Sequence, residues 1–436
     1  MTGDSVATKT GSSRLAWAML ACLSLAALHS KVAGLAWVLW LIWSVQEARG
    51  RVGEPCSLGD RAALQSTARI WAGGLLIYAM AELLMAWAWH GACCTYTSDV
   101  NSHLRLLLSA MATICLVRHL SPWPDMRHHI NLAVVLALIT GCALVAVSGR
   151  NLPSHPIPWA GAMVFLVCVL LPHAGDSSHS MMRRWLYGVG SAMGMAAVVL
   201  SQSRGAFVVL AFPIVLMVIH GLRTYSRSLI WVGAACVLAA ATLASLTAAP
   251  SDPLRLRLAA VEMEQALKTQ DFNSSLGARV YLNQLAWHHF SESPWVGVGA
   301  TQRLALIKNA GLDLPPAQSD ALSHVRTLGH VHNQYLHHAM DNGIVGLLGF
   351  LALLVCMGWI SARLHAIDRV ASHQMALITL AHAVGSVSNV NLAHNYYALM
   401  WGLCTGLVFL QALAATRTDQ RTAPLQTGSQ PKHQHP

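Results

Sequence analysis

Residues 330–346 read HVHNQYLHHAMDNGIVG, and they join the longest hydrophilic part of the chain to an apolar run that ends near Ile360. Two histidines, His330 and His332, and an asparagine, Asn333, therefore stand just before a membrane helix. Polar groups at such a boundary lose bulk water but keep contact with it, which suits proton transfer. The stretch predicts a membrane fold with a candidate site at the membrane edge.

The rest of the chain is mostly apolar. Of its 436 residues, 55% are hydrophobic and only 11% are charged. Apolar runs of about 20 residues, long enough to cross a hydrocarbon core, recur along most of it. Lipid offers no partner to unpaired backbone groups, so these runs should be helices, and we expect an all-α polytopic membrane protein. About twelve spans are expected, at 15–29, 32–46, 69–90, 103–120, 129–148, 157–173, 185–202, 205–222, 228–249, 340–361, 370–388 and 395–415.

Charge distribution predicts how the chain lies in the membrane. The formal net charge of +10 would suit a nucleic-acid partner, but the sequence has no basic block and no aromatic-interleaved basic patch, so we expect no nucleic acid. The arginines instead gather in alternate loops, such as Arg183 with Arg184 and Arg363 with Arg369. The positive-inside rule then places both termini on the cytoplasmic side of the membrane, which in a Gram-negative cell is the inner membrane. It places residues 250–339 outside, which is the periplasm of a Gram-negative cell.

The domain plan follows from these spans. Within the outer loop, hydrophobic spacing predicts amphipathic helices over 254–267 and 276–290, the second of which Ser274 or Ser275 can cap. The expected units are spans one to nine at 1–249, the periplasmic loop at 250–339, spans ten to twelve at 340–416, and a polar, disordered cytoplasmic tail at 417–436.

Two arginines on the outer side are candidate anion ligands. Arg204 lies in the sequence SQSRG between two apolar runs, where an arginine costs a few kcal/mol unless it is solvated or paired. The alternative is an interfacial arginine that snorkels, but a guanidinium matches phosphate oxygens in a bidentate way. Arg279 opens the second amphipathic helix, where a surface arginine is the default. Other outer arginines, Arg303 and Arg326 among them, are expected to be solvated or to contact lipid headgroups.

His332 is the best candidate for a general base. Unperturbed imidazole titrates near pH 6.5, so it can accept a proton in the periplasm. Asn333 can hydrogen-bond a sugar or orient its neighbour, and a helix that starts near Gln334 favours anions at this spot. Gly343 and Gly346 suit a helix face that packs closely on a neighbour.

The nearby histidines do not predict a metal site. Zinc needs three or four converging ligands, whereas the His-x-His pair of His330 and His332 would place its side chains on different helix faces. His337 and His338 follow, and Asp341 is the only acidic residue beside them. We therefore expect no metal and no cofactor here, with arginines in place of a cation.

Two further polar features have no assigned role. The last outer loop carries a polar patch, which is either ordinary loop polarity or part of the lining of the same cavity: Asn389, Asn391, His394 and Asn395. Glu82 lies inside the third predicted span, where a buried carboxylate is costly and implies a partner that the sequence does not name.

The spacing His332-Asn333, nine residues, Gly343, two residues, Gly346 resembles the signature of bacterial O-antigen ligases. The wider group includes O-antigen polymerases and protein O-oligosaccharyltransferases. The SQSRG sequence at 201–205 is similar to the family pattern at the equivalent outer loop. The resemblance extends over roughly residues 190–400, and a His-Asn pair alone would be a weak signal.

The series from Arg279 to the sequence PWVGVG at 294–299 is similar to the family's arginine, aromatic and proline-glycine series. The resemblance implies a helical, GT-C-like membrane glycosyltransferase. Its donor would be O-antigen polysaccharide on undecaprenyl pyrophosphate, and its acceptor would be lipid A–core oligosaccharide, both reached through membrane lipids. Transfer would be inverting and metal-independent, with His332 as base, Arg204 and Arg279 on the pyrophosphate, and Asn333, Asn389 and His330 contacting substrate.

Other functions remain open at this point. An O-antigen polymerase or a protein O-oligosaccharyltransferase would use the same donor, although the glycine spacing favours the ligase. A lipid-linked sugar flippase belongs to a different class. It would predict internal repeats or charged residues inside several spans, and neither is visible.

Overall fold

The computed structural model describes residues 4–49, 59–88, 97–152, 154–203, 205–206, 209–210 and 256–422, and throughout these ranges the regular elements are all helical. This confirms the expected all-α class. The helices are α1 (Asp4–Ser24), α2 (Ser30–Arg49), α3 (Gly59–Ala88), α4 (Thr97–His119), α5 (Met126–Ser148), α6 (Pro156–Gly175), α7 (Met181–Leu200), α10 (Leu256–Lys268), α11 (Ser275–Glu292), α12 (Gly299–Lys308), α13 (Pro316–Asp320), α14 (Ser323–Thr327), α15 (Gln334–His365), α16 (Arg369–Ser388), η1 (Asn391–Ala393) and α17 (Asn395–Thr422).

Five of the described helices, α3, α5, α6, α15 and α17, are long and apolar enough to cross a membrane. The protein is therefore a polytopic membrane protein. The predicted spans at 205–222 and 228–249 fall almost wholly outside the described residues, so the total of twelve stays a prediction. Helix α17 continues to Thr422 and makes the first part of the segment 417–436 helical, where we expected disorder.

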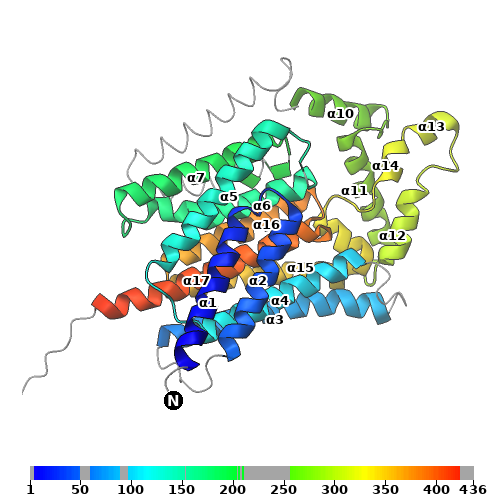
Figure 1. Ribbon diagram of the computed structural model, residues 1–436. Coiled ribbons are helices and arrows are strands. Elements are labelled where there is room, and N and C mark those ends of the chain that lie inside the picture. The colour runs from blue at the N-terminus through cyan, green and yellow to red at the C-terminus, as the bar shows by residue number, and fades with distance from the viewer. Residues whose placement is uncertain are drawn as a thin grey trace, which may run out of the picture.

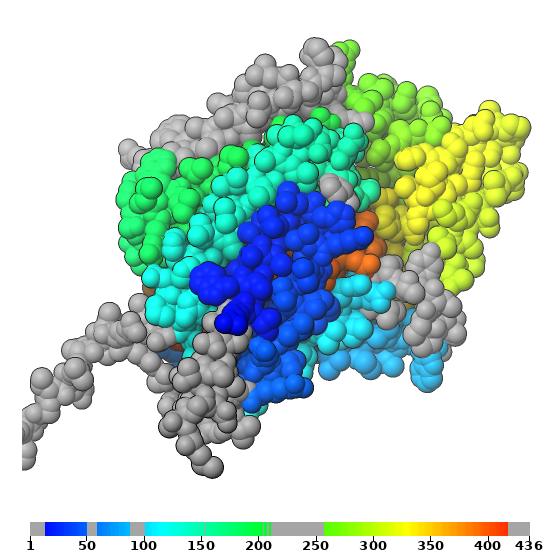
Figure 2. Space-filling view, in the orientation of Figure 1, coloured from blue at the N-terminus to red at the C-terminus, as the bar shows by residue number. Residues whose placement is uncertain are grey.

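Two parts of the molecule are distinct in the figures. Helices α1–α7 and α15–α17 form a bundle, and α10–α14 form a lobe on one side of it (Figure 1). In the space-filling view this lobe, yellow and yellow-green, stands out from the bundle (Figure 2). Helix α1 begins and α17 ends on the side away from the lobe. We refer to the two ends of the bundle as the lobe end and the far end.

The lobe has a hydrophobic core of its own. Leu282 of α11, Val325 of α14 and Met340 of α15 are buried together, so the start of α15 belongs to the lobe as much as to the bundle. The predicted amphipathic helices correspond to α10 and α11. The predicted cap is also observed, because the Ser274 hydroxyl accepts a hydrogen bond from the Gly277 N–H at 3.0 Å.

A buried ion pair joins the lobe to α15. The Arg303 side chain is 2% exposed, and its Nε lies 2.7 Å from Asp341 Oδ1. Its Nη1 also donates to the Gly329 carbonyl. The expectation of a solvated Arg303 was therefore wrong, because its carboxylate partner lies 38 residues further along the chain. Arg326 is likewise engaged within the lobe, where it donates to the Ala310 and Ser319 carbonyls.

Helix α15 has a kink at Gly343, where φ is 62°. The turn before α12 fits into this kink, because the Ile344 N–H donates to the Pro294 carbonyl at 2.8 Å. A Cβ at Gly343 would collide with the backbone of Trp295. We expected Gly343 to serve helix–helix packing. Its observed role is a left-handed backbone conformation and a close contact with this turn, which side chains disfavour.

Candidate active site at the lobe end

His332 lies in a short connection between the lobe and α15, and its backbone is strained. Its φ is 59°, a left-handed conformation that costs a residue with a side chain about 1–3 kcal/mol. Val331 before it is fully buried in the lobe core. Asn333 after it caps α15, accepting from the Tyr335 and Leu336 N–H groups at 3.1 and 3.2 Å. Both neighbours therefore hold His332 in place.

An amide oxygen determines which ring nitrogen of His332 carries the proton. Its Nδ1 lies 3.1 Å from Asn389 Oδ1. The amide nitrogen of Asn389 donates to Asn391 Oδ1 at 3.1 Å, which is consistent with its oxygen facing the imidazole. Nδ1 is then the donor, and Nε2 keeps its lone pair. Gln334 holds this loop beside α15, because its Oε1 accepts from the Leu392 N–H at 3.1 Å.

Four histidines gather at this end, and we call them the lobe-end cluster: His155, His330, His332 and His394. The ring centroids of His330 and His332 are 4.3 Å apart, and those of His330 and His394 are 5.5 Å apart. His155 stacks on His394 with centroids at 5.8 Å. Sequence reasoning missed His155, because it stands alone just before α6 and no motif marks it.

Burial and positive charge keep these imidazoles neutral. Burial lowers the pKa of His332 to about 3, and the charge of Arg279 lowers it further while the Asn389 hydrogen bond opposes the shift. Burial and the neighbouring histidines lower the pKa of His330 to about 2. The pKa of His155 is lowered by burial and by Arg150 and Arg279. The site therefore combines neutral imidazoles with cationic guanidinium groups, which suits an anionic ligand.

Of the sequence-predicted residues, the structure brings His332, His330, Asn389 and His394 together and places Arg279 within electrostatic reach of His332. Asn333 is adjacent, but its side-chain oxygen is engaged in the helix cap. Arg204 lies outside the described residues. Its neighbour Gly205 is described and packs against Ser388, next to Asn389.

A mostly apolar pocket borders the cluster. Its lining comes from α6, α16, the 205–209 segment and the 388–397 segment. Asn389 and Asn391 line it together with Phe165, Val209 and Tyr397. The cavity therefore has a mostly apolar wall and a polar edge made by the same asparagine that contacts His332.

Glu82, whose partner the sequence did not reveal, pairs with α15. Its Oε1 lies 3.0 Å from His338 Nδ1, and its Oε2 accepts from the Asn342 amide at 2.6 Å. His338 Nε2 in turn lies 3.1 Å from the Tyr78 hydroxyl and 2.8 Å from the Gln334 amide nitrogen. This network crosses from α3 to the first turn of α15 and supports the position of the site.

The lobe-end cluster is not arranged as a metal site. Within the described ranges, the groups of three His, Cys, Asp or Glu side chains close enough to share an ion do not include His330 or His332. His337 and His338 point to different carboxylates, Asp341 and Glu82. The arrangement can accept a proton at His332 Nε2 and hold negative charge beside Arg279.

A family model described as O-antigen ligase matches residues 189–351. The match extends from α7 into α15 and contains the SQSRG sequence, the Arg279–Gly299 series and the His-Asn signature. No curated protein matches the chain. The family supports a glycosyltransferase-like function of the O-antigen ligase or polymerase type, with polysaccharide and lipid substrates. The match and the motifs inside it are consistent with a multi-pass membrane protein of the O-antigen ligase superfamily.

Proposed function

We propose that this protein is an O-antigen ligase, which transfers polysaccharide from undecaprenyl pyrophosphate to a sugar hydroxyl of lipid A–core oligosaccharide. The observation that supports this most is the arrangement of His332. Its Nδ1 is held by Asn389, its Nε2 keeps a lone pair, and the charge of Arg279 acts on it. A base and an anion ligand side by side are what this reaction needs.

The chemistry is a single displacement at the anomeric carbon. The acceptor hydroxyl gives its proton to His332 Nε2 while its oxygen attacks the anomeric carbon of the donor. The bond from that carbon to the phosphate oxygen breaks, and undecaprenyl pyrophosphate leaves with the electron pair. Attack opposite the leaving group inverts the anomeric configuration. General-base assistance of this kind contributes roughly 10²–10⁴-fold.

The leaving group gains negative charge, which the arginines can neutralise. Arg279 and Arg204 are the proposed pyrophosphate ligands, because a guanidinium binds phosphate oxygens with two parallel hydrogen bonds. His330 Nδ1 is buried and has no hydrogen-bond partner within the described part of the chain, so it is the proposed contact for a donor sugar or phosphate oxygen. Asn333, whose oxygen caps α15, would offer its amide N–H groups to substrate.

Donor binding would also raise the pKa of the proposed base, His332. In the unoccupied enzyme, burial and Arg279 hold the pKa of His332 at about 3, which makes it a weak base. A pyrophosphate bound to Arg279 offsets the guanidinium charge and raises the pKa of His332. The imidazole therefore becomes an effective base only when the donor is in place, so the site is activated by its own substrate.

The apolar character of the pocket beside Asn389 supports a lipid-linked donor. Its wall of Phe165, Val209 and Tyr397 suits an isoprenoid segment, and its polar edge lies toward His332. Two lipid-anchored substrates can reach such a site by lateral diffusion. On the proposed orientation, with positive loops inside, the lobe faces the periplasm. A reporter fused after Asp313 should then behave as periplasmic, and a cytoplasmic result would contradict the orientation.

The decisive experiment is deletion of the gene followed by gel electrophoresis of the cell's lipopolysaccharide. A ligase predicts loss of the polysaccharide ladder, with both the core and the lipid-linked polymer retained. A core capped by one repeat unit would indicate a polymerase instead. Intact lipopolysaccharide with a modified protein lost would indicate a protein O-oligosaccharyltransferase. Transfer by the purified protein between purified donor and acceptor lipids then tests the reaction itself.

A further inference from the structure

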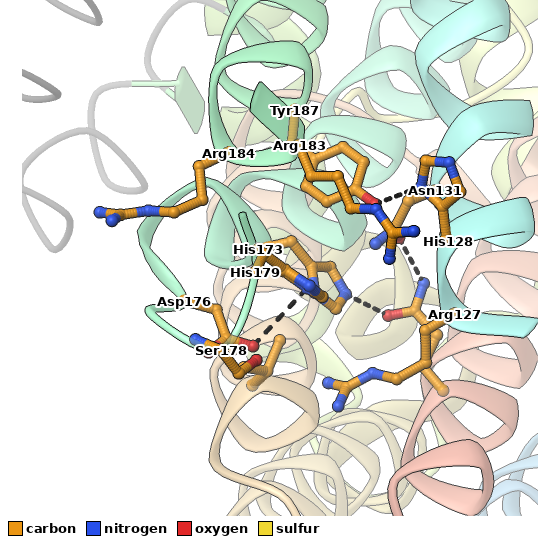
Figure 3. Close-up of polar contacts among 12 residues, drawn as sticks. Arg127, His128, Asn131, His173, Asp176, Ser178, His179, Arg183, Arg184 and Tyr187 are labelled. Atoms are coloured by element: carbon orange, nitrogen blue, oxygen red, sulfur yellow. Dashed lines mark hydrogen bonds and ion pairs between the residues drawn. The ribbon is translucent and has the colours of Figure 1, made fainter. Parts of the chain in front are cut away.

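A second group of histidines lies at the other end of α6. His155 of the lobe-end cluster precedes this helix, and His173 stands eighteen residues further along, about 27 Å away at the helical rise of 1.5 Å per residue. His173, Asp176 and His179 converge there, with one potential ligand atom from each lying within 4.8 Å of the others. Figure 3 shows these side chains directed toward one another at the turn between α6 and α7. We call them the far-end cluster.

The spacing within this group is that of metal ligands. His173 Nδ1 lies 3.2 Å from His179 Nε2, and His179 Nε2 lies 3.6 Å from Asp176 Oδ2. Around a tetrahedral zinc ion with bonds of about 2.0–2.1 Å, neighbouring ligand atoms are about 3.3 Å apart. Two of the three separations are therefore close to the spacing that such an ion requires, and the third is within 4.8 Å.

The outer hydrogen bonds of His173 have the form found around metal-bound histidines. Its Nε2 lies against the Gln411 amide oxygen at 2.5 Å, and that oxygen also accepts from the Gln374 amide at 2.7 Å. The Gln411 nitrogen donates to Asn131 Oδ1 at 2.9 Å, which is consistent with its oxygen facing the imidazole. Nε2 of His173 is then the donor, and the Nδ1 lone pair points to His179. A ligand histidine typically donates its other N–H in this manner.

Asp176 supplies the negative charge that a cation site needs. Arg127 and Arg183 lie near enough to act on His179, and each is paired with a carboxylate other than Asp176. Arg127 Nη2 is 2.9 Å from Asp368 Oδ2, and Arg183 Nη1 is 3.3 Å from Asp125 Oδ1. Asp176 pairs with His179 itself. Two neutral imidazoles and one carboxylate form a common ligand set for divalent transition metals.

We propose that His173 Nδ1, Asp176 and His179 Nε2 bind one divalent transition-metal ion, with zinc as the best fit, and that water completes the coordination. The ion would fix the α6–α7 turn against α17 through the bond from His173 to Gln411. This site is separate from the transfer chemistry and does not rest on the proposed function. On the proposed orientation it lies on the cytoplasmic side.

The chain offers a matched control in α11. His288, His289 and Glu292 also lie close enough to share an ion. The side chains of His288 and Glu292 are 65% and 57% exposed, and the three residues belong to one surface helix. Zinc bound there would be held weakly at the surface. A variant of this group therefore distinguishes a specific buried site from nonspecific binding of zinc to surface histidines.

The test uses the full-length protein purified in detergent through a tag without histidines, stripped of metal and titrated with Zn²⁺ or Co²⁺. We expect one tightly bound ion per chain and visible Co²⁺ absorption bands. His179→Ala and Asp176→Asn alter only the turn. Each removes a proposed ligand and should weaken metal binding by at least about 100-fold, because mutation of a residue that only hydrogen-bonds a ligand already weakens metal binding by up to that factor. His289→Ala should bind like the wild type.

Three results would contradict the proposed site or move it elsewhere. Absence of a tight ion from the wild type would overturn the proposal. Unchanged binding in both turn variants would also overturn it, and loss of the ion in His289→Ala would assign the metal to α11. Because His173 is fully buried in the bundle, the variants at the less buried Asp176 and His179 decide the result. Their near-wild-type elution as a single species would show that they are folded.

Discussion

The two histidine clusters stand at the two ends of one helix and differ mainly in the carboxylate that Asp176 adds to the far-end cluster. At the lobe end, Arg279 and Arg150 act on neutral histidines. At the far end, Asp176 joins two histidines, and the nearby arginines are paired with other carboxylates. Because charge complementarity selects the ligand, the first cluster suits a pyrophosphate and the second suits a metal cation.

Both clusters use the same means of orienting an imidazole. An amide oxygen accepts the N–H of the functional ring, from Asn389 at the lobe end and from Gln411 at the far end. This hydrogen bond leaves a lone pair on the other ring nitrogen, which is Nε2 in His332 and Nδ1 in His173. The orientation of a histidine therefore does not decide its role by itself, and the surrounding charges do.

The largest expected effect comes from His332. His332→Ala should slow transfer by roughly 10²–10⁴-fold, because the acceptor hydroxyl loses its base. The measurement is in vitro transfer with purified donor and acceptor lipids. His288→Ala changes an exposed histidine of the same lobe and should retain the wild-type rate. A wild-type rate in His332→Ala would remove this residue from the mechanism.

Substitution of Arg279 is expected to have the second-largest effect on transfer. Arg279→Ala should lower transfer by about 100-fold, since a positioned donor to developing negative charge is lost. Arg279→Lys should fall between, because lysine keeps the charge but not the planar fork. Arg257→Ala, in exposed α10, is the matched control. If Arg279→Ala and Arg257→Ala transferred at the same rate, the lobe-end cluster would have no arginine-based anion site on α11.

Asn389 should have a smaller effect, because it acts through His332. Asn389→Ala should lower transfer by about 10-fold, in the range seen when an outer partner of a functional histidine is lost. In a His332→Ala background the same change should have no further effect, since the oriented ring is absent. Additive losses in the double variant would show that Asn389 contacts substrate on its own account.

The pH dependence should separate the unoccupied from the occupied site. Because the pKa of His332 is about 3 without substrate, kcat/KM should change by less than about two-fold as pH falls from 8 to about 5. At saturating donor, pyrophosphate raises the pKa of His332, so the acid limb of kcat should lie at higher pH than that of kcat/KM. Coincident limbs would contradict activation by the donor.

Chelation should have the smallest effect on transfer. EDTA should change the rate by less than about two-fold in the wild type and in Asp176→Asn alike, because the far-end cluster lies at the opposite end of α6 from His155 of the lobe-end cluster, about 27 Å along the helix. A loss of activity in both proteins, restored by a divalent ion, would instead place a metal at the lobe end. The two clusters would then both bind a metal ion, and the proposed difference between their ligands would be wrong.

Local patterns predicted the parts of the fold that depend on nearby residues. Apolar run length predicted the five described helices that are long enough to cross a membrane. The Ser274 hydroxyl predicted the start of α11, and Asn333 was placed correctly before the first turn of α15. The role of Gly343 was missed, because a kink depends on the turn at Trp295 that fits into it. The burial of Arg303 was missed for the same reason, since Asp341 is distant in sequence.

The sequence by itself determined that the chain is helical, crosses a membrane and carries the His-Asn signature, because hydrophobicity, capping and motif spacing are properties of neighbouring residues. Only the tertiary structure decided which distant residues meet. It placed Asn389 against His332, His155 beside His394, and Gln411 behind His173. The tautomer and pKa of a buried histidine depend on these partners, because in a weakly screened interior each nearby dipole and charge acts strongly.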